Sequence, residues 1–170
     1  KENVLQKVFP AFGTVNAIAL YGSFNPEIAE LVKTRCLELH RRFSFFEPGS
    51  DIFRLNGQAG IEPIPVHPDT FFVLSHALAY GKETQGAFDI TSGEACRLWR
   101  DAIRSARIPS EKDIAGCRSL IGSTDLVLDR TDGTALLRRS GQKVDLGGIA
   151  KGYAAAEAVR ILRDHKVRNA

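Results

Sequence analysis

Apolar residues recur along this chain with two different periods, which separate expected helices from expected strands. Apolar and β-branched residues fill 13–22, as in a strand. Asn25 and Pro26 suit a helix start, and the apolar residues that follow share one helical face: Ile28, Leu31, Val32, Cys36 and Leu39. The remaining pattern predicts a short helical turn that starts from 50–51 and a helix over 69–85. Further helices are predicted after Ser92, from Ser110 and, behind the glycine-rich segment, up to about His165, together with a hairpin over 124–139.

This order of elements predicts an α+β fold, with helices packed on a largely antiparallel sheet. The 170 residues suffice for one domain with a sizeable core, and the sequence shows no repeat or linker. Residues 166–170 read as the start of a further strand. We therefore expect that more protein belongs after Ala170.

Charge and composition narrow the functional classes. The net charge is only +3, and the basic residues are dispersed rather than clustered as in a nucleic-acid-binding protein. No apolar run approaches the roughly 20 residues that span a bilayer. The sequence contains no Met, so we expect that it was processed or trimmed, which leaves a removed export signal open.

Cysteine and histidine residues give no sign of a metal site. Three widely spaced cysteines form no CxxC motif, so we expect free or buried thiols: Cys36, Cys96 and Cys117. The four histidines are scattered and lack the spacing of metal ligands: His40, His67, His76 and His165.

The stretch "KVDLGGIAKGYA" joins a strand-like segment to a helix through Gly147 and Gly148. Glycines at such a turn let the backbone approach a ligand closely, and a helix start favours anions. Lys151 could reach an anionic oxygen, and Asp145 could accept hydrogen bonds from a ribose or a ring N–H. The spacing matches neither GxGxxG nor a P-loop, so a plain tight turn remains an equal alternative.

Two further stretches each allow two interpretations. In "GAFDITSG" (86–93), Asp89 is either a turn-capping residue or part of a loop that wraps a planar ligand. Four phenylalanines in 43–53 are either core residues or a stacking wall for an aromatic ring, with Phe46 as the best candidate for stacking.

Taken together, these stretches resemble the ApbE family, the FAD:protein FMN transferases. "FGTVNAIALYG" resembles the family's opening T-M-G-T strand, and "FSFFEPGSDIFRLN" resembles S-T-Y-x-P-x-S-E-I-S-R-x-N. "GAFDITSGEACRLW" resembles G-x-F-D-x-T-V-G-P-L-V-x-L-W, and "VDLGGIAKGYA" resembles V-D-L-G-G-I-A-K-G-Y-A. The four stretches occur in order and span nearly the whole chain.

The resemblance implies a fold and an activity. The expected architecture is ApbE-like and related to the T-fold, as a single FAD-binding domain over 1–170. Such enzymes bind FAD and Mg²⁺ and move FMN onto a Thr or Ser hydroxyl of an acceptor protein, releasing AMP. Acceptors are typically subunits of membrane redox pumps or flavin-bearing reductases. The alternatives are an FAD pyrophosphatase that yields FMN and AMP, and a flavin-binding module without catalysis.

The resemblance also implies site residues. The positions that match FAD contacts are Phe12, Phe46, Ala87, Phe88, Asp89, Asp145 and Lys151. Gly148 matches a position whose backbone oxygen ligates the metal. The chain departs from the family pattern where Phe12 replaces Met, Phe46 replaces Tyr, and Glu94 and Ala95 replace Pro and Leu.

The family's later half has no counterpart in 1–170. That half carries an acid-and-Thr element that completes the Mg²⁺ site and a His that is a candidate general base. We therefore expect the catalytic groups beyond Ala170, and no transferase activity from these residues alone. A natural short homologue is the alternative. Family members are often exported and lipid-anchored, so the resemblance implies a periplasmic or cell-envelope lipoprotein, with the cytoplasm as the alternative.

Overall fold

The computed structural model describes residues 4–170, which form two compact units. The first unit contains residues up to 42 together with Ile149–Ala170, and the second contains Phe43–Gly148. Each unit has its own antiparallel sheet and its own helices, so the α+β class is confirmed. No helix within 4–170 combines the length and the apolar composition that crossing a lipid bilayer requires.

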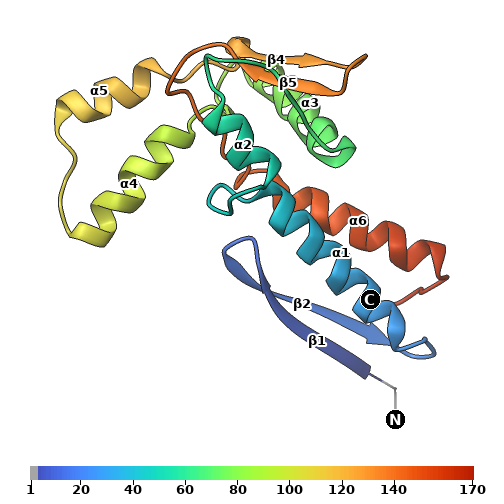
Figure 1. Ribbon diagram of the computed structural model, residues 1–170. Helices are drawn as coiled ribbons and strands as arrows, with labels where there is room; N and C mark the ends of the chain where they lie inside the picture. The colour runs from blue at the N-terminus through green and yellow to red at the C-terminus, as the bar shows by residue number, and fades with distance from the viewer. Residues whose placement is uncertain (1–3) are drawn as a thin grey trace. The chain divides into compact units, whose positions relative to one another are not determined.

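The first unit is built on a hairpin of β1 (Val4–Ala11) and β2 (Thr14–Tyr21), paired antiparallel along their full length. Helix α1 (Glu27–Phe43) runs along this hairpin, and α6 (Ala150–Asp164) lies beside α1 (Figure 1). An ion pair of 2.6 Å between Lys7 and Glu30 joins β1 to α1. The sequence did not reveal β1, because its apolar alternation is weak and Pro10 interrupts it.

The core of the first unit confirms most of the predicted α1 face. Ile28, Val32, Cys36 and Leu39 are buried, as are Phe9 and Leu20 of the hairpin. Leu31 was expected on the same face but is 47% exposed. Asn25 behaves as the predicted cap, because its side-chain oxygen accepts from the N–H of Glu27 at 3.0 Å.

The second unit holds the remaining elements. Its sheet has the order β3 (Ile64–Pro65), β5 (Thr134–Leu137), β4 (Leu126–Asp129). Its helices are α2 (Asp51–Gly57), α3 (Pro68–Glu83), α4 (Gly93–Ser105) and α5 (Glu111–Ser119), with a 3-10 turn at Ser123–Asp125. Figure 1 shows α3 beside the sheet. Val73 and Leu74 of α3 are buried, and so is Leu137 of β5.

The predicted helices and the hairpin are confirmed, and two of the helices begin at the expected serine caps. The hydroxyl of Ser50 accepts from the N–H of Phe53, and that of Ser110 accepts from the N–H of Asp113. The segment 166–170 is not a strand, although the carbonyl of Asn169 accepts a hydrogen bond from the N–H of Tyr21 in β2.

Candidate functional site

The loop after α1 presents an aromatic side chain to solvent. The hydroxyl of Ser44 accepts a hydrogen bond from the N–H of Phe46 at 3.2 Å and fixes this turn. Phe46 is 62% exposed, and the ring of Phe45 meets it edge to face at 5.1 Å. Of the four phenylalanines, Phe43 alone is buried, while Phe53 is 41% exposed. The core interpretation therefore holds for Phe43, and Phe46 has the exposure that a stacking wall requires.

Asp89 organises the loop 86–93 from within. One oxygen of its carboxylate accepts from the N–H of Thr91 at 2.8 Å and from the Thr91 hydroxyl at 2.6 Å. The other oxygen accepts from the N–H of Ser123 at 3.0 Å. The turn-capping role of Asp89 is thus observed. In this loop Ala87 is exposed and Phe88 is half-buried, and their contact with FAD stays a prediction.

The glycine turn is folded around Asp145. The N–H of Asp145 donates to the carbonyl of Ile90 at 2.8 Å, and its carboxylate accepts from the N–H of Gly147 at 2.7 Å. A Cβ added at Gly148 would lie 3.1 Å from the ring of Phe88. The turn therefore lies directly against the loop 86–93, and any side chain at 148 would displace the Phe88 ring by a few tenths of an ångström. The structure brings Asp145, Gly148 and Phe88 together as one group.

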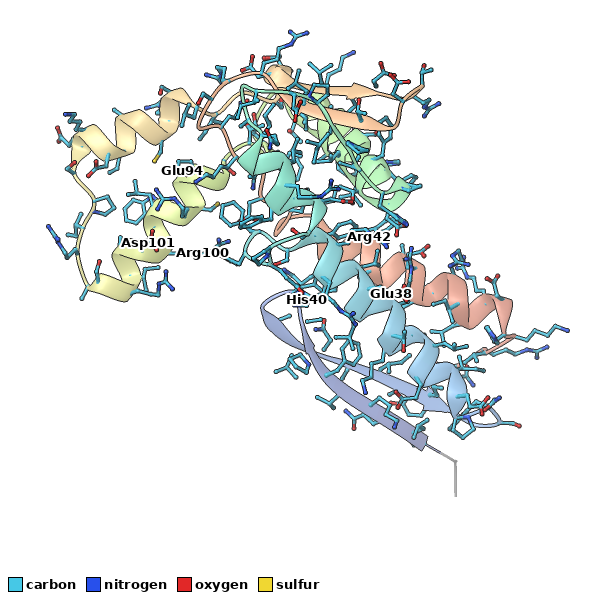
Figure 2. All side chains as sticks on the ribbon, viewed as in Figure 1. Glu38, His40, Arg42, Glu94, Arg100 and Asp101 are labelled. Atoms are coloured by element: carbon cyan, nitrogen blue, oxygen red, sulfur yellow. The ribbon has the colours of Figure 1, made fainter. Side chains whose placement is uncertain are left out.

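Arg100 of α4 links this turn to the aromatic loop. Its Nη2 donates to the carboxylate of Asp145 at 2.6 Å. Figure 2 labels Arg100 on α4. Its guanidinium lies 4.9 Å from the ring centre of Phe46 and 5.5 Å from that of Phe45. Sequence reasoning did not find Arg100, because no motif marks it and its partners are distant along the chain. Only the packing of α4 reveals its position.

The start of α4 is tied to the strand-like segment before Asp145. The N–H of Gly93 donates to the carbonyl of Lys143 at 2.9 Å, and the ammonium of Lys143 pairs with Glu94 at 2.8 Å. Hydrogen bonds from Arg97, with a further contribution from Lys143, lower the pKa of Glu94 although burial opposes them. Glu94, which departs from the family pattern, thus has a defined role as an ion-pair partner in this protein.

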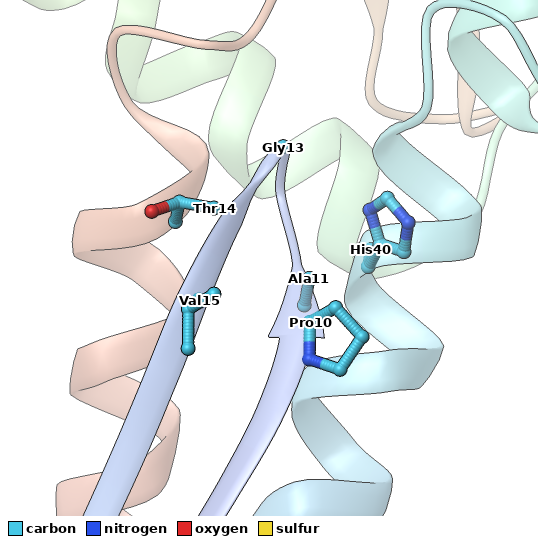
Figure 3. Close-up of a pocket in the computed structure, with 6 residues that line it drawn as sticks. All are labelled: Pro10, Ala11, Gly13, Thr14, Val15 and His40. Atoms are coloured by element: carbon cyan, nitrogen blue, oxygen red, sulfur yellow. The ribbon is translucent and has the colours of Figure 1, made fainter.

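The first unit contains the other two predicted contacts. Phe12 and Gly13 form the two-residue turn of the β1–β2 hairpin, with φ of 54° and 70°. The N–H of Phe12 donates to Nδ1 of His40 at 3.1 Å. Beside this turn lies an open groove of about 510 Å³, shown in Figure 3 and lined by Pro10, Ala11, Gly13, Thr14, Val15 and His40. Lys151 lies exposed in the first turn of α6.

The predicted site residues are therefore divided between the two units. Phe12 and Lys151 belong to the first unit, and the other predicted residues belong to the second. Within 4–170, no three His, Cys, Asp or Glu side chains come together to hold a metal ion. These side chains alone do not make a magnesium site, so the proposed role of the Gly148 carbonyl stays a prediction.

Comparison with known proteins identifies the family. The model of the ApbE family matches residues 12–170. An FAD:protein FMN transferase of Klebsiella pneumoniae is 28% identical over 145 residues, which are 83% of this chain and 46% of that protein. The FAD:protein FMN transferase of Treponema pallidum is 30% identical over 126 residues, which are 71% of this chain and 35% of that protein.

Solved structures of ApbE proteins have the same fold as this chain. The crystal structure of the ApbE protein from Thermotoga maritima superposes with a TM-score of 0.88 at 28% identity, covering 96% of this chain and 54% of that one. The flavin transferase ApbE from Vibrio cholerae shares the fold, with a TM-score of 0.87 at 20% identity over 99% of this chain and 56% of that one. This chain belongs to the ApbE family. It spans about half the length of relatives and structures such as these.

Proposed function

We propose that this protein binds FAD and transfers its FMN part to a Thr or Ser hydroxyl of an acceptor protein, with release of AMP. The observation that carries the proposal is the convergence, within the second unit, of segments that resemble the family's FAD contacts. The loop of Phe46, the loop of Phe88 and the turn of Asp145 and Gly148 meet through the contacts described above.

These residues fit FAD by their chemistry. Phe46 offers an exposed aromatic face on which a flat ring stacks. Asp145 would accept a hydrogen bond from a ribose hydroxyl or a ring N–H, and the exposed Ala87 and half-buried Phe88 would line the ligand. For the first unit, taken by itself, the resemblance implies FAD contacts at Phe12, whose ring suits stacking, and at Lys151, whose ammonium suits a phosphate.

The reaction breaks the pyrophosphate P–O bond between the FMN and AMP parts of FAD and forms a phosphoester with the acceptor oxygen. The acceptor hydroxyl loses its proton, and AMP leaves as the other product. We expect the general base beyond Ala170, as the resemblance implies. Bound Mg²⁺ would neutralise charge on the pyrophosphate, and the Gly148 carbonyl is its proposed ligand here.

Binding and transfer are tested separately. Calorimetric titration of the 170-residue chain with FAD, with and without Mg²⁺, should show saturable binding, and no heat of binding in either condition would contradict the first half of the proposal. FMN transfer is then tested with the full natural protein, which is incubated with FAD, Mg²⁺ and an acceptor protein that carries a D-x-x-S/T-G-A-S/T-like stretch. Mass spectrometry should find the acceptor heavier by one FMN.

The same assay separates the alternatives. Release of FMN and AMP without any acceptor, and without modification when acceptor is present, would indicate a pyrophosphatase. FAD binding without either product would indicate a flavin-binding module. A family member that flavinylates its own target serves as the positive control.

A further inference from the structure

Arg100 contacts two of the three segments that carry the predicted FAD contacts of the second unit. Its Nη2 holds the carboxylate of Asp145 at 2.6 Å, and its planar guanidinium faces Phe46 at 4.9 Å. The hydrogen bond is charge-assisted, and a cation over an aromatic face is attracted by the ring. One side chain therefore fixes both the acceptor group of the glycine turn and the exposed aromatic ring.

The second terminal nitrogen of the Arg100 guanidinium lacks a hydrogen-bond partner within residues 4–170. Nη1 of Arg100 is buried and has no hydrogen-bond partner among the described residues. A buried donor without a partner costs free energy, whereas an apolar group of similar shape in the same place does not. The contacts of Arg100 with Asp145 and Phe46 point to a role in holding the ligand-binding groups.

We propose that Arg100 is a positioning residue for FAD binding, which holds Asp145 and the Phe46 ring in the arrangement that receives the flavin nucleotide. This inference rests on the proposed function. It assigns to Arg100 a gain in ligand affinity in addition to its contacts within the fold. The residue acts through Asp145 and Phe46 and needs no direct contact with the ligand.

The central test is Arg100→Met, which keeps the length of the side chain and removes the charge and the donors. Calorimetric titration with FAD should show an affinity about tenfold lower, since a charge-assisted hydrogen bond and a cation–π contact are lost. The melting temperature should fall as well, because the largely buried Asp145 carboxylate loses its ion-pair partner. The matched control is Arg104→Met on the same helix, whose side chain is 80% exposed, and it should bind FAD as the wild type does.

A double-mutant cycle separates positioning from a general effect of charge. If Arg100 acts through Asp145, then Arg100→Met, Asp145→Asn and the double variant should lose similar affinity, with strong non-additivity. The proposal is overturned if Arg100→Met binds within twofold of the wild type, if Arg104→Met loses as much, or if the two losses simply add.

Two further outcomes can be told apart from a failure of the proposed role of Arg100. If the wild type itself binds no FAD, the proposed function fails and not merely the role of Arg100. If Arg100→Met does not fold, Arg100→Lys takes its place, because it keeps a charge for Asp145 and loses the planar fork. A loss greater than twofold in the lysine variant then supports the proposal, and a smaller one overturns it.

Discussion

The backbone N–H of Phe12 donates a hydrogen bond to Nδ1 of His40 at 3.1 Å, while the two rings meet edge to face at 5.6 Å. This contact joins the tip of the β1–β2 hairpin to α1. It also holds Phe12 at a φ of 54°, a left-handed conformation that costs free energy for a residue other than Gly or Asn. The proposed contact of Phe12 with FAD stays a prediction, which the next substitutions test.

Replacement of Phe12 by Asn should separate these two roles. Asn followed by Gly13 is the preferred pair for a two-residue hairpin turn, so stability to urea should be retained or raised by up to about 1 kcal/mol. FAD affinity should fall, because the ring is lost. The control is Phe12→Ala, which keeps the unfavourable conformation and should lose both stability and affinity. A Phe12→Asn variant that binds FAD as tightly as the wild type would contradict the proposed contact.

Removal of the Phe46 ring should affect binding and leave the fold intact. Because Phe46 is 62% exposed, Phe46→Ala should change stability by no more than about 0.5 kcal/mol. Loss of stacking should lower FAD affinity by about tenfold. Calorimetric titration measures the affinity, and Phe72→Ala, at a 48% exposed phenylalanine of α3, is the control. Equal loss in both variants would show a nonspecific effect of aromatic surface.

Gly148→Ala tests the close packing of the glycine turn. The new methyl would lie 3.1 Å from the ring of Phe88, so that ring must move by a few tenths of an ångström. We expect weaker FAD binding, measured by calorimetry, with at most a modest loss of stability. Gly152→Ala is the control, because nothing lies within 4 Å of its added Cβ and it lies inside α6. That variant should be stabilised by about 0.5–1 kcal/mol. Unchanged FAD affinity in Gly148→Ala would exclude a tight fit at this turn.

The pair of Glu157 and Arg35 should make stability depend on pH. Nη2 of Arg35 on α1 lies 2.8 Å from the Glu157 carboxylate on α6. Hydrogen bonds from Arg160 first, and then from Arg35, lower the pKa of Glu157 below its ordinary value of 4.5 although burial opposes them. A group whose pKa is lowered by folding stabilises the fold above its unfolded pKa, and this contribution is lost as the pH falls through the folded pKa.

Glu157→Gln should therefore lower the free energy of unfolding by about 1–2 kcal/mol at pH 7. The difference from the wild type should stay constant down to about pH 5 and shrink below 4.5 as the wild-type carboxyl takes up its proton. Urea unfolding from pH 7 to pH 3 measures it. Glu38→Gln is the control, since Glu38 is 49% exposed and lies 3.7 Å from Arg35. A difference between Glu157→Gln and the wild type that did not change with pH would show that the pair does not titrate as stated.

Local signals in the sequence were sufficient to predict most of the secondary structure and to indicate the family. Some features depend only on neighbours along the chain, such as the helix caps Ser50 and Ser110 and the apolar face of α1. The sequence pattern is therefore enough to predict them. The order of four glycine- and aromatic-rich stretches was enough to indicate the family. Strand β1 was not predicted, because Pro10 interrupts its apolar pattern. The segment is recognised as a strand only from its pairing with β2.

The tertiary structure decided which of the candidate residues act together. Asp89 could be a cap or a ligand contact by sequence, and only the folded loop shows its oxygens satisfied by Thr91 and Ser123. Phe43 and Phe46 look alike in the sequence, yet packing buries the first and exposes the second. Arg100 has no local signature at all, because its role depends on Asp145, 45 residues further along the chain. Contacts between distant segments are set by packing, and no local pattern encodes them.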